Sequence, residues 1–204
     1  MTVRVLAMAA LALAVASTAA HAADPRYPDW PCTQAKVPDI SLAAVWAGPP
    51  LDDVQNKWKD DAKISALVAK LSARKTPLDE AEKSVKEFLA ASATDKTANA
   101  KLLFAGLFDT LNAQRSQVMS GLERVSRKQR EAADKIREDT LALQALQGAT
   151  PRDEAKVEAL SNELIWKTRI FEDRHKVVRF VCEVPTTIDQ RLFALGRVIQ
   201  QEME

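Results

Sequence analysis

Residues 97–148 read TANAKLLFAGLFDTLNAQRSQVMSGLERVSRKQREAADKIREDTLALQALQG and have the pattern of one long helix. The stretch contains no proline, and its only glycines before the last residue are Gly106 and Gly121. A single helix over this stretch would be about 78 Å long. Apolar residues recur in steps of four, three and seven at Phe104, Phe108, Leu111, Val118, Leu122, Val125, Ala132, Ile136 and Leu143. This period near 3.5 predicts a coiled coil, and Arg115 and Gln129 fall on the same line of residues.

A sharp reversal follows the long helix at residues 148–153, which read GATPRD. We expect Gly148 to end one helix and Thr150 to cap the next, which runs to about Cys182. That next helix carries its own heptad line at Val157, Leu164, Phe171 and Val178. So short a connection implies antiparallel neighbours, so the two helices form a hairpin arm at roughly residues 119–181. A second apolar face on the same helix suggests further contacts, and it comprises Trp166, Ile170, Val177 and Val181.

The remaining helices are predicted from caps and apolar stripes. The first covers residues 51–73, and the second runs from Leu78 to about Ala91 with Thr76 as its cap. A final helix is expected after Pro185 ends or kinks the preceding one, with Thr186 or Thr187 as its cap. The prediction is therefore an all-α fold: a helical bundle over residues 51–204 with a long antiparallel coiled-coil hairpin.

Residues 1–22 have the pattern of a secretory signal peptide. Arg4 precedes an apolar run over residues 5–15, and Ala20-His21-Ala22 forms a cleavage pattern. The alternative is an uncleaved anchor, but the run is short for a membrane span of roughly 20 residues. The N-terminus therefore predicts export to the periplasm, with a soluble mature chain that has no stable membrane span.

The charge balance of the mature chain disfavours nucleic-acid binding. The full chain has 29 basic and 28 acidic side chains. Arg4 is the only charged residue of the signal peptide, so its removal leaves equal numbers of both signs. Nucleic-acid binders usually carry a basic excess instead.

Residues 23–50 differ from the rest of the chain because they hold six of the nine prolines. Proline restricts the backbone, which predicts an extended segment that we call the strap. Trp30 and Trp46 are expected to anchor it by packing, the alternative being that they stack on a ligand. Two cysteines in an exported chain indicate a disulfide between Cys32 and Cys182. The alternatives are two buried free thiols or pairing between chains.

Residues that carry chemistry are sparse in this sequence. Glu172 and His175 have the spacing of a helical metal-ligand pair, but di-iron bundles need a second such pair and further glutamates. His175 is the only histidine after residue 22, so these two residues are weak metal candidates. No catalytic, cofactor-binding or phosphate-binding motif was found, which disfavours an enzyme and predicts no cofactor.

The tip of the predicted hairpin is rich in apolar residues. They include Leu141, Leu143, Leu146, Leu160, Ile165 and Trp166. Such a cluster is either a wider coiled-coil interior or a surface for a protein partner or for self-association. We therefore expect a non-catalytic periplasmic adaptor or assembly factor that binds a protein of the cell envelope. A helical module for a small ligand or a metal is the alternative, and an enzyme of unknown type is third.

Overall fold

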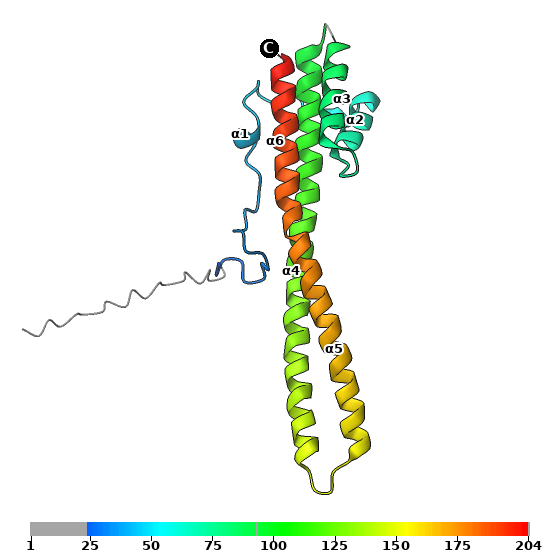
Figure 1. Cartoon of the computed structure of the whole chain (residues 1–204). Helices are drawn as coiled ribbons and strands as arrows, with labels where there is room; N and C mark the ends of the chain where they lie inside the picture. The colour runs from blue at the N-terminus through cyan, green and yellow to red at the C-terminus, as the bar shows by residue number, and fades with distance from the viewer. Residues whose placement is uncertain (1–23, 93, 204) are drawn as a thin grey trace, which may run out of the picture.

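The computed structural model describes residues 24–92 and 94–203, and the predicted signal peptide lies outside them. The described chain is helical and contains no β-strand, which confirms the all-α prediction. Figure 1 shows a bundle at one end and a two-helix projection at the other. The helical elements are α1 (Leu42–Val45), the 3₁₀ helix η1 (Lys57–Lys59), α2 (Ala62–Ser72), α3 (Leu78–Ala90), α4 (Lys96–Gly148), α5 (Glu154–Val181) and α6 (Glu183–Met203). None of the described helices is long and apolar enough to cross a membrane.

Helix α4 serves both ends of the molecule. Its first half lies in the main core, where Leu103, Phe104 and Leu107 are fully buried. Helix α6 runs along this half (Figure 1), α2 also packs on it, and α3 packs mainly on α6. The wide apolar surface of residues 102–111 therefore has partners on several sides, as its sequence requires.

The second half of α4 pairs with α5 to form the arm, defined here as residues 119–181. Val157, Leu164 and Val178 are buried against α4, and the amide of Gln129 donates a 3.1 Å hydrogen bond to the Phe171 carbonyl. The heptad residues of α4 thus meet those of α5 within one chain. Thr150 does not cap α5, because the carboxylate of Asp153 accepts the Lys156 N–H at 3.1 Å and takes that role.

Helices α5 and α6 are separated by Cys182 alone. The predicted final helix therefore begins earlier than Thr186, and the assignment of Thr186 or Thr187 as its cap is wrong. Pro185 lies buried in the first turn of α6. A proline is tolerated there because the first N–H groups of a helix have no intrahelical acceptor. The two helices consequently follow one another along α4 (Figure 1).

The predicted helix at residues 51–73 is interrupted. Asn56 adopts a left-handed conformation with φ of 64°, and α2 begins only after Asp61 accepts the N–H groups of Lys63 and Ile64. Between them, η1 buries Trp58, whose indole N–H donates to Asp109 of α4 at 3.0 Å. Burial of one large aromatic side chain thus overrides the local helical pattern.

The cap predicted for α3 is also different. Pro77 precedes the helix, and the Thr76 hydroxyl donates instead to the Lys70 carbonyl at 2.9 Å. Thr76 therefore satisfies the end of α2 rather than the start of α3.

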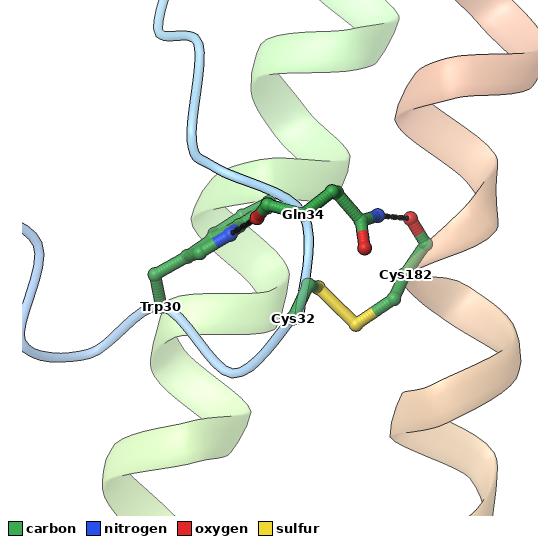
Figure 2. The surroundings of a disulfide bond; sticks show 4 residues. All are labelled: Trp30, Cys32, Gln34 and Cys182. Atoms are coloured by element: carbon green, nitrogen blue, oxygen red, sulfur yellow. Dashed lines mark hydrogen bonds between the residues drawn. A yellow bond between two sulfur atoms is a disulfide. The ribbon is translucent and has the colours of Figure 1, made fainter. Parts of the chain in front are cut away.

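The strap is held to the helices at several places. Near α1, the Trp46 ring stacks on Phe104 with centroids 4.3 Å apart. Farther toward the N-terminus, Cys32 forms a disulfide with Cys182 at the α5–α6 junction (Figure 2). Beside it, the Gln34 side chain donates to the Cys182 carbonyl. The strap is therefore joined covalently to the point where α5 gives way to α6.

A buried arginine connects three segments. Arg115 of α4 is 3% exposed, pairs with Asp189 of α6 at 2.8 Å and donates to the Pro38 carbonyl of the strap at 3.0 Å. Partial burial raises the pKa of Asp189 above its usual range, although Arg115 opposes this shift. Arg115, one of the two polar residues on the α4 heptad line, thus links α4, α6 and the strap through non-covalent contacts.

Loss of the disulfide should destabilise the fold. The bond joins residues 150 positions apart, and closing so long a loop restricts the unfolded chain, a stabilisation of about 2–5 kcal/mol. We expect urea denaturation of the double variant Cys32→Ser, Cys182→Ser to show this loss. Dithiothreitol should reproduce the loss in the wild type and leave the double variant unchanged. An unaltered midpoint in both tests would contradict a structural role for the bond.

Two glycines of the structure should respond oppositely to alanine. A Cβ at Gly196 would lie 2.8 Å from both Phe104 Cε2 and the Val45 carbonyl oxygen, whereas the nearest atom to a Cβ at Gly121 is 3.7 Å away. Gly196→Ala should therefore lower the free energy of unfolding by about 1–3 kcal/mol through overpacking. Gly121→Ala should raise it by roughly 0.5–1 kcal/mol through helix propensity. Chemical denaturation of both variants checks this pair.

Candidate functional site

The predicted metal candidates do not converge with other ligands. Glu172 and His175 are both exposed on α5, and the His175 ring lies 6.5 Å from the Phe171 ring. Across residues 24–92 and 94–203, no group of three or more histidine, cysteine or acidic side chains is placed to hold a metal ion. The described structure thus gathers no further ligands around this pair.

The two strap tryptophans are occupied by contacts within the chain. Trp46 is buried on Phe104, and its indole N–H donates to the Pro49 carbonyl at 2.8 Å. Trp30 packs against a small cluster formed by Leu122, Val178 and Cys182, and its N–H donates to the Gln34 carbonyl at 2.7 Å. Both rings therefore act as packing groups in this structure (Figure 2 shows Trp30).

The apolar residues at the tip separate into two groups. Leu143, Leu146 and Leu160 are half-buried between the helices. Leu141, Ile165 and Trp166 are exposed, Leu141 to 60% and Ile165 to 67%. Part of the predicted cluster thus belongs to the coiled-coil interior, and the rest faces solvent.

The most extensive exposed apolar feature lies along α5. Trp166, Ile170, Val177 and Phe180 are 62%, 36%, 59% and 77% exposed. We call these four residues the outer stripe. Trp166 and Phe180 each follow a buried heptad residue, Leu164 or Val178, by two positions, which is about 200° around the helix. Trp166 and Phe180 consequently lie on the side of α5 that faces away from α4. Val177, one position before the buried Val178, lies about 100° from that buried residue and borders the α4 side.

Sequence reasoning found most of this stripe but missed one member. It placed Val181 on the second apolar face, where the structure has Val181 half-buried and Phe180 the most exposed. The missed signal is a seven-residue step from Trp166 through Asp173 to Phe180. Because the middle position of that line, Asp173, is charged, the apolar spacing between Trp166 and Phe180 is fourteen residues and the second heptad line was not recognised.

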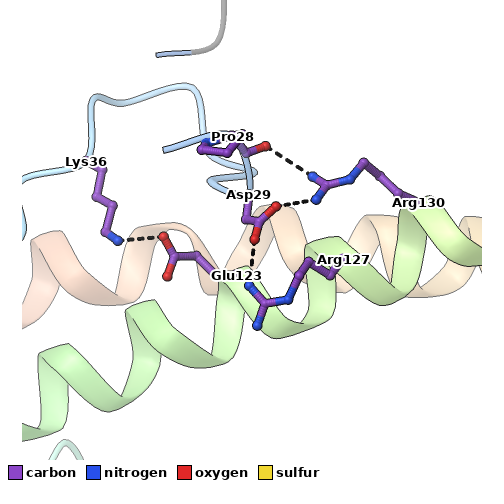
Figure 3. A network of polar contacts seen from close by, with 6 residues as sticks. All are labelled: Pro28, Asp29, Lys36, Glu123, Arg127 and Arg130. Atoms are coloured by element: carbon purple, nitrogen blue, oxygen red, sulfur yellow. Dashed lines mark hydrogen bonds and ion pairs between the residues drawn. The ribbon is translucent and has the colours of Figure 1, made fainter. Parts of the chain in front are cut away.

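The strap occupies a different side of the arm. The Asp29 carboxylate bridges Arg127 and Arg130 of α4, the first at 2.6 Å, and Arg130 also donates to the Pro28 carbonyl. Lys36 pairs with Glu123 at 2.5 Å (Figure 3). Hydrogen bonds from Arg127 and Arg130 lower the pKa of Asp29. These contacts fasten the strap to one face of α4.

A polar cluster ties the two helices of the arm together near its middle. Asp139 is 7% exposed and accepts from Lys167 of α5 at 2.7 Å and from Lys135 of its own helix at 3.0 Å. Glu163 also pairs with Lys167. Hydrogen bonds from Lys167 and Lys135 lower the pKa of Asp139. The cluster gives the two helices a defined register where their apolar contact is narrow.

Comparisons of the chain with known protein families, with curated proteins and with solved structures gave no significant match.

The contribution of Asp139 should depend on pH. Because its folded pKa lies below the ordinary value of 3.8, the ionised carboxylate stabilises the fold above that pH, and the effect is lost as pH falls through the folded pKa. Asp139→Asn should therefore lower stability at pH 7 and converge with the wild type at strongly acidic pH. Urea denaturation across pH measures this difference.

The exposed residue Glu131 provides the control for this experiment. Glu131→Gln should follow the wild type at every pH. A gap between Asp139→Asn and the wild type that persists unchanged at acidic pH would contradict the assigned ionic role.

Proposed function

We propose that this chain is a non-catalytic interaction protein of the periplasm, an adaptor or assembly factor that binds a protein partner through the outer stripe of α5. The observation that carries the proposal is the exposure of Trp166, Ile170, Val177 and Phe180 on one helix face. Aromatic side chains supply large contact areas, and exposed apolar patches commonly mark interaction sites. The signal-peptide pattern and the disulfide support export as the setting.

The arrangement of the arm supports the same reading. The stripe lies on a regular helix that α4, the strap and the disulfide hold in place. A contact surface that needs little ordering on binding loses less conformational entropy than a mobile one. The stripe residues are four, seven and three positions apart. Side chains with this spacing lie on one helix face and can contact another helix.

Site-specific photo-crosslinking in the producing cell tests this function. We would replace Phe180, and separately Trp166, by p-benzoylphenylalanine, which preserves an aromatic group at each position. Illumination should give discrete adducts with a larger protein at both positions. The same probe at Glu172, an exposed polar residue of α5 outside the stripe, serves as the control.

Charge placed in the stripe should remove these adducts. Ile170→Glu with Val177→Glu introduces carboxylates at exposed positions, so the fold should be retained to within about 0.5 kcal/mol per change. Circular dichroism would verify that the helices persist. Equal adducts at Glu172 and Phe180, or none at either stripe position, would count against the proposal.

A further inference from the structure

A groove beside the outer stripe combines apolar side chains with basic ones, whereas the stripe itself is entirely apolar. It lies between α4 and α5 near the bundle end of the arm and has a volume of about 690 Å³. Apolar side chains from both helices form much of its lining, namely Val118, Leu122, Val125, Val177, Val178 and Val181. Val177 belongs to both the groove and the stripe, so the two features form a continuous surface.

The charged contacts of the strap lie on a different face of α4 from the groove. Glu123, Arg127 and Arg130 contact the strap (Figure 3), whereas the groove is lined by Gly121, Val125 and Lys128. Each set has the four-then-three spacing of one helix face, and the two sets are offset by two positions, about 200° around α4. The charged contacts of the strap therefore leave the face of Gly121, Val125 and Lys128 free, although the Trp30 ring packs on Leu122 and Val178, which also line the groove.

Gly121 widens the groove on the α4 side. A Cβ built there would meet only Arg124 Nη2, at 3.7 Å. No packing constraint therefore demands glycine at this position. Glycine has a low helix propensity, so its presence lowers the stability of α4 slightly. Its effect on the surface is to leave the wall of the groove without a side chain.

Basic side chains border the apolar lining. Arg124 and Lys128 of α4 and Arg174 of α5 all line the groove. Within the described part of the chain, none of the three takes part in an ion pair, although Arg127 and Arg130 nearby both pair with Asp29. The surface thus combines an apolar centre with positive charge from both sides.

We propose that this groove binds an amphipathic helix of a partner protein whose apolar face is flanked by aspartate or glutamate. The proposal rests on the interaction function above and specifies the chemistry of the partner. A third helix lying between α4 and α5 would place its apolar residues on Val125, Val177 and Val181. Its flanking carboxylates would then face Arg124, Lys128 and Arg174, the complementary pattern that coiled coils use to select partners.

The same charges disfavour a second copy of this chain as the occupant. A two-fold interface brings identical patches together, so the basic borders of two grooves would meet. Like charges across an interface oppose association. An anionic lipid surface would satisfy the charges, but a groove between two helices matches the shape of a helix better than that of a flat bilayer.

Selection from a peptide library against the full-length oxidised protein tests the proposal. Each 21-residue peptide would carry a constant Leu/Ile heptad line, with flanking positions varied among Glu, Gln and Lys. We expect selected peptides to be enriched in Glu at the flanks. Arg174→Glu and Lys128→Glu should each lower the affinity for the best peptide by about tenfold, and Val177→Glu should abolish its binding.

Arg179→Glu is the matched control, because Arg179 is an exposed arginine of α5 that lies outside the groove. It should change the affinity by less than about twofold. Selection of Lys-rich or uncharged flanks, or affinity that Arg174→Glu leaves intact, would overturn the proposal.

Two further measurements test whether a second copy of the chain or an anionic membrane occupies the groove instead. A positive result in either would overturn the proposal. One is a concentration-dependent dimer in sedimentation that Val177→Glu removes. The other is binding to phosphatidylglycerol vesicles that Val177→Glu removes while no acidic peptide is selected. If Phe180 gives crosslinks but no acidic peptide is selected, only the proposed acidic helix in the groove is rejected. If Phe180 gives no crosslinks, the proposed interaction function is rejected as well.

Discussion

Burial of the apolar surface of α4 organises both the bundle and the arm. Over its first half, Leu103, Phe104 and Leu107 are covered by α2, α6 and the strap, so the helix becomes the centre of a bundle. Over its second half, only a narrow apolar line remains, and one helix, α5, is enough to cover it. A single continuous helix therefore changes from core element to projecting arm because the width of its apolar face changes along its length.

The contacts that do not follow the heptads set the geometry of the arm. The strap crosses from the bundle to the arm, where Asp29 holds Arg127 and Arg130 and Cys32 is bonded to Cys182 (Figures 2 and 3). Because α5 and α6 are separated by Cys182 alone, this bond lies where the chain passes from one helix to the next. The face of α5 opposite α4 is left with exposed apolar side chains, and the arm displays them on an ordered helix.

Much of the fold could be predicted because its signals are local. Heptad spacing, the turn at residues 148–153 and the absence of proline from 97–148 were enough to predict the hairpin. Predictions of helix starts were less accurate, since several side chains competed for each cap: Asp153 replaced Thr150, and Thr76 bonded to α2 instead of capping α3. The break before α2 was missed because burial of Trp58 against α4 is a long-range effect.

Local sequence patterns were sufficient to predict the helical class, the antiparallel pairing of α4 with α5 and a second apolar face on α5, because periodicity and turn chemistry act between near neighbours. Which apolar residues stay exposed depends on how the helices and the strap pack together. Leu143 and Leu160 are half-buried between the helices, whereas Trp166 and Phe180 remain at the surface. The same packing decides which cations are paired, since Asp29 reaches Arg127 only when the strap lies on α4. Exposure and charge pairing depend on segments far apart in the chain, and no local pattern encodes them.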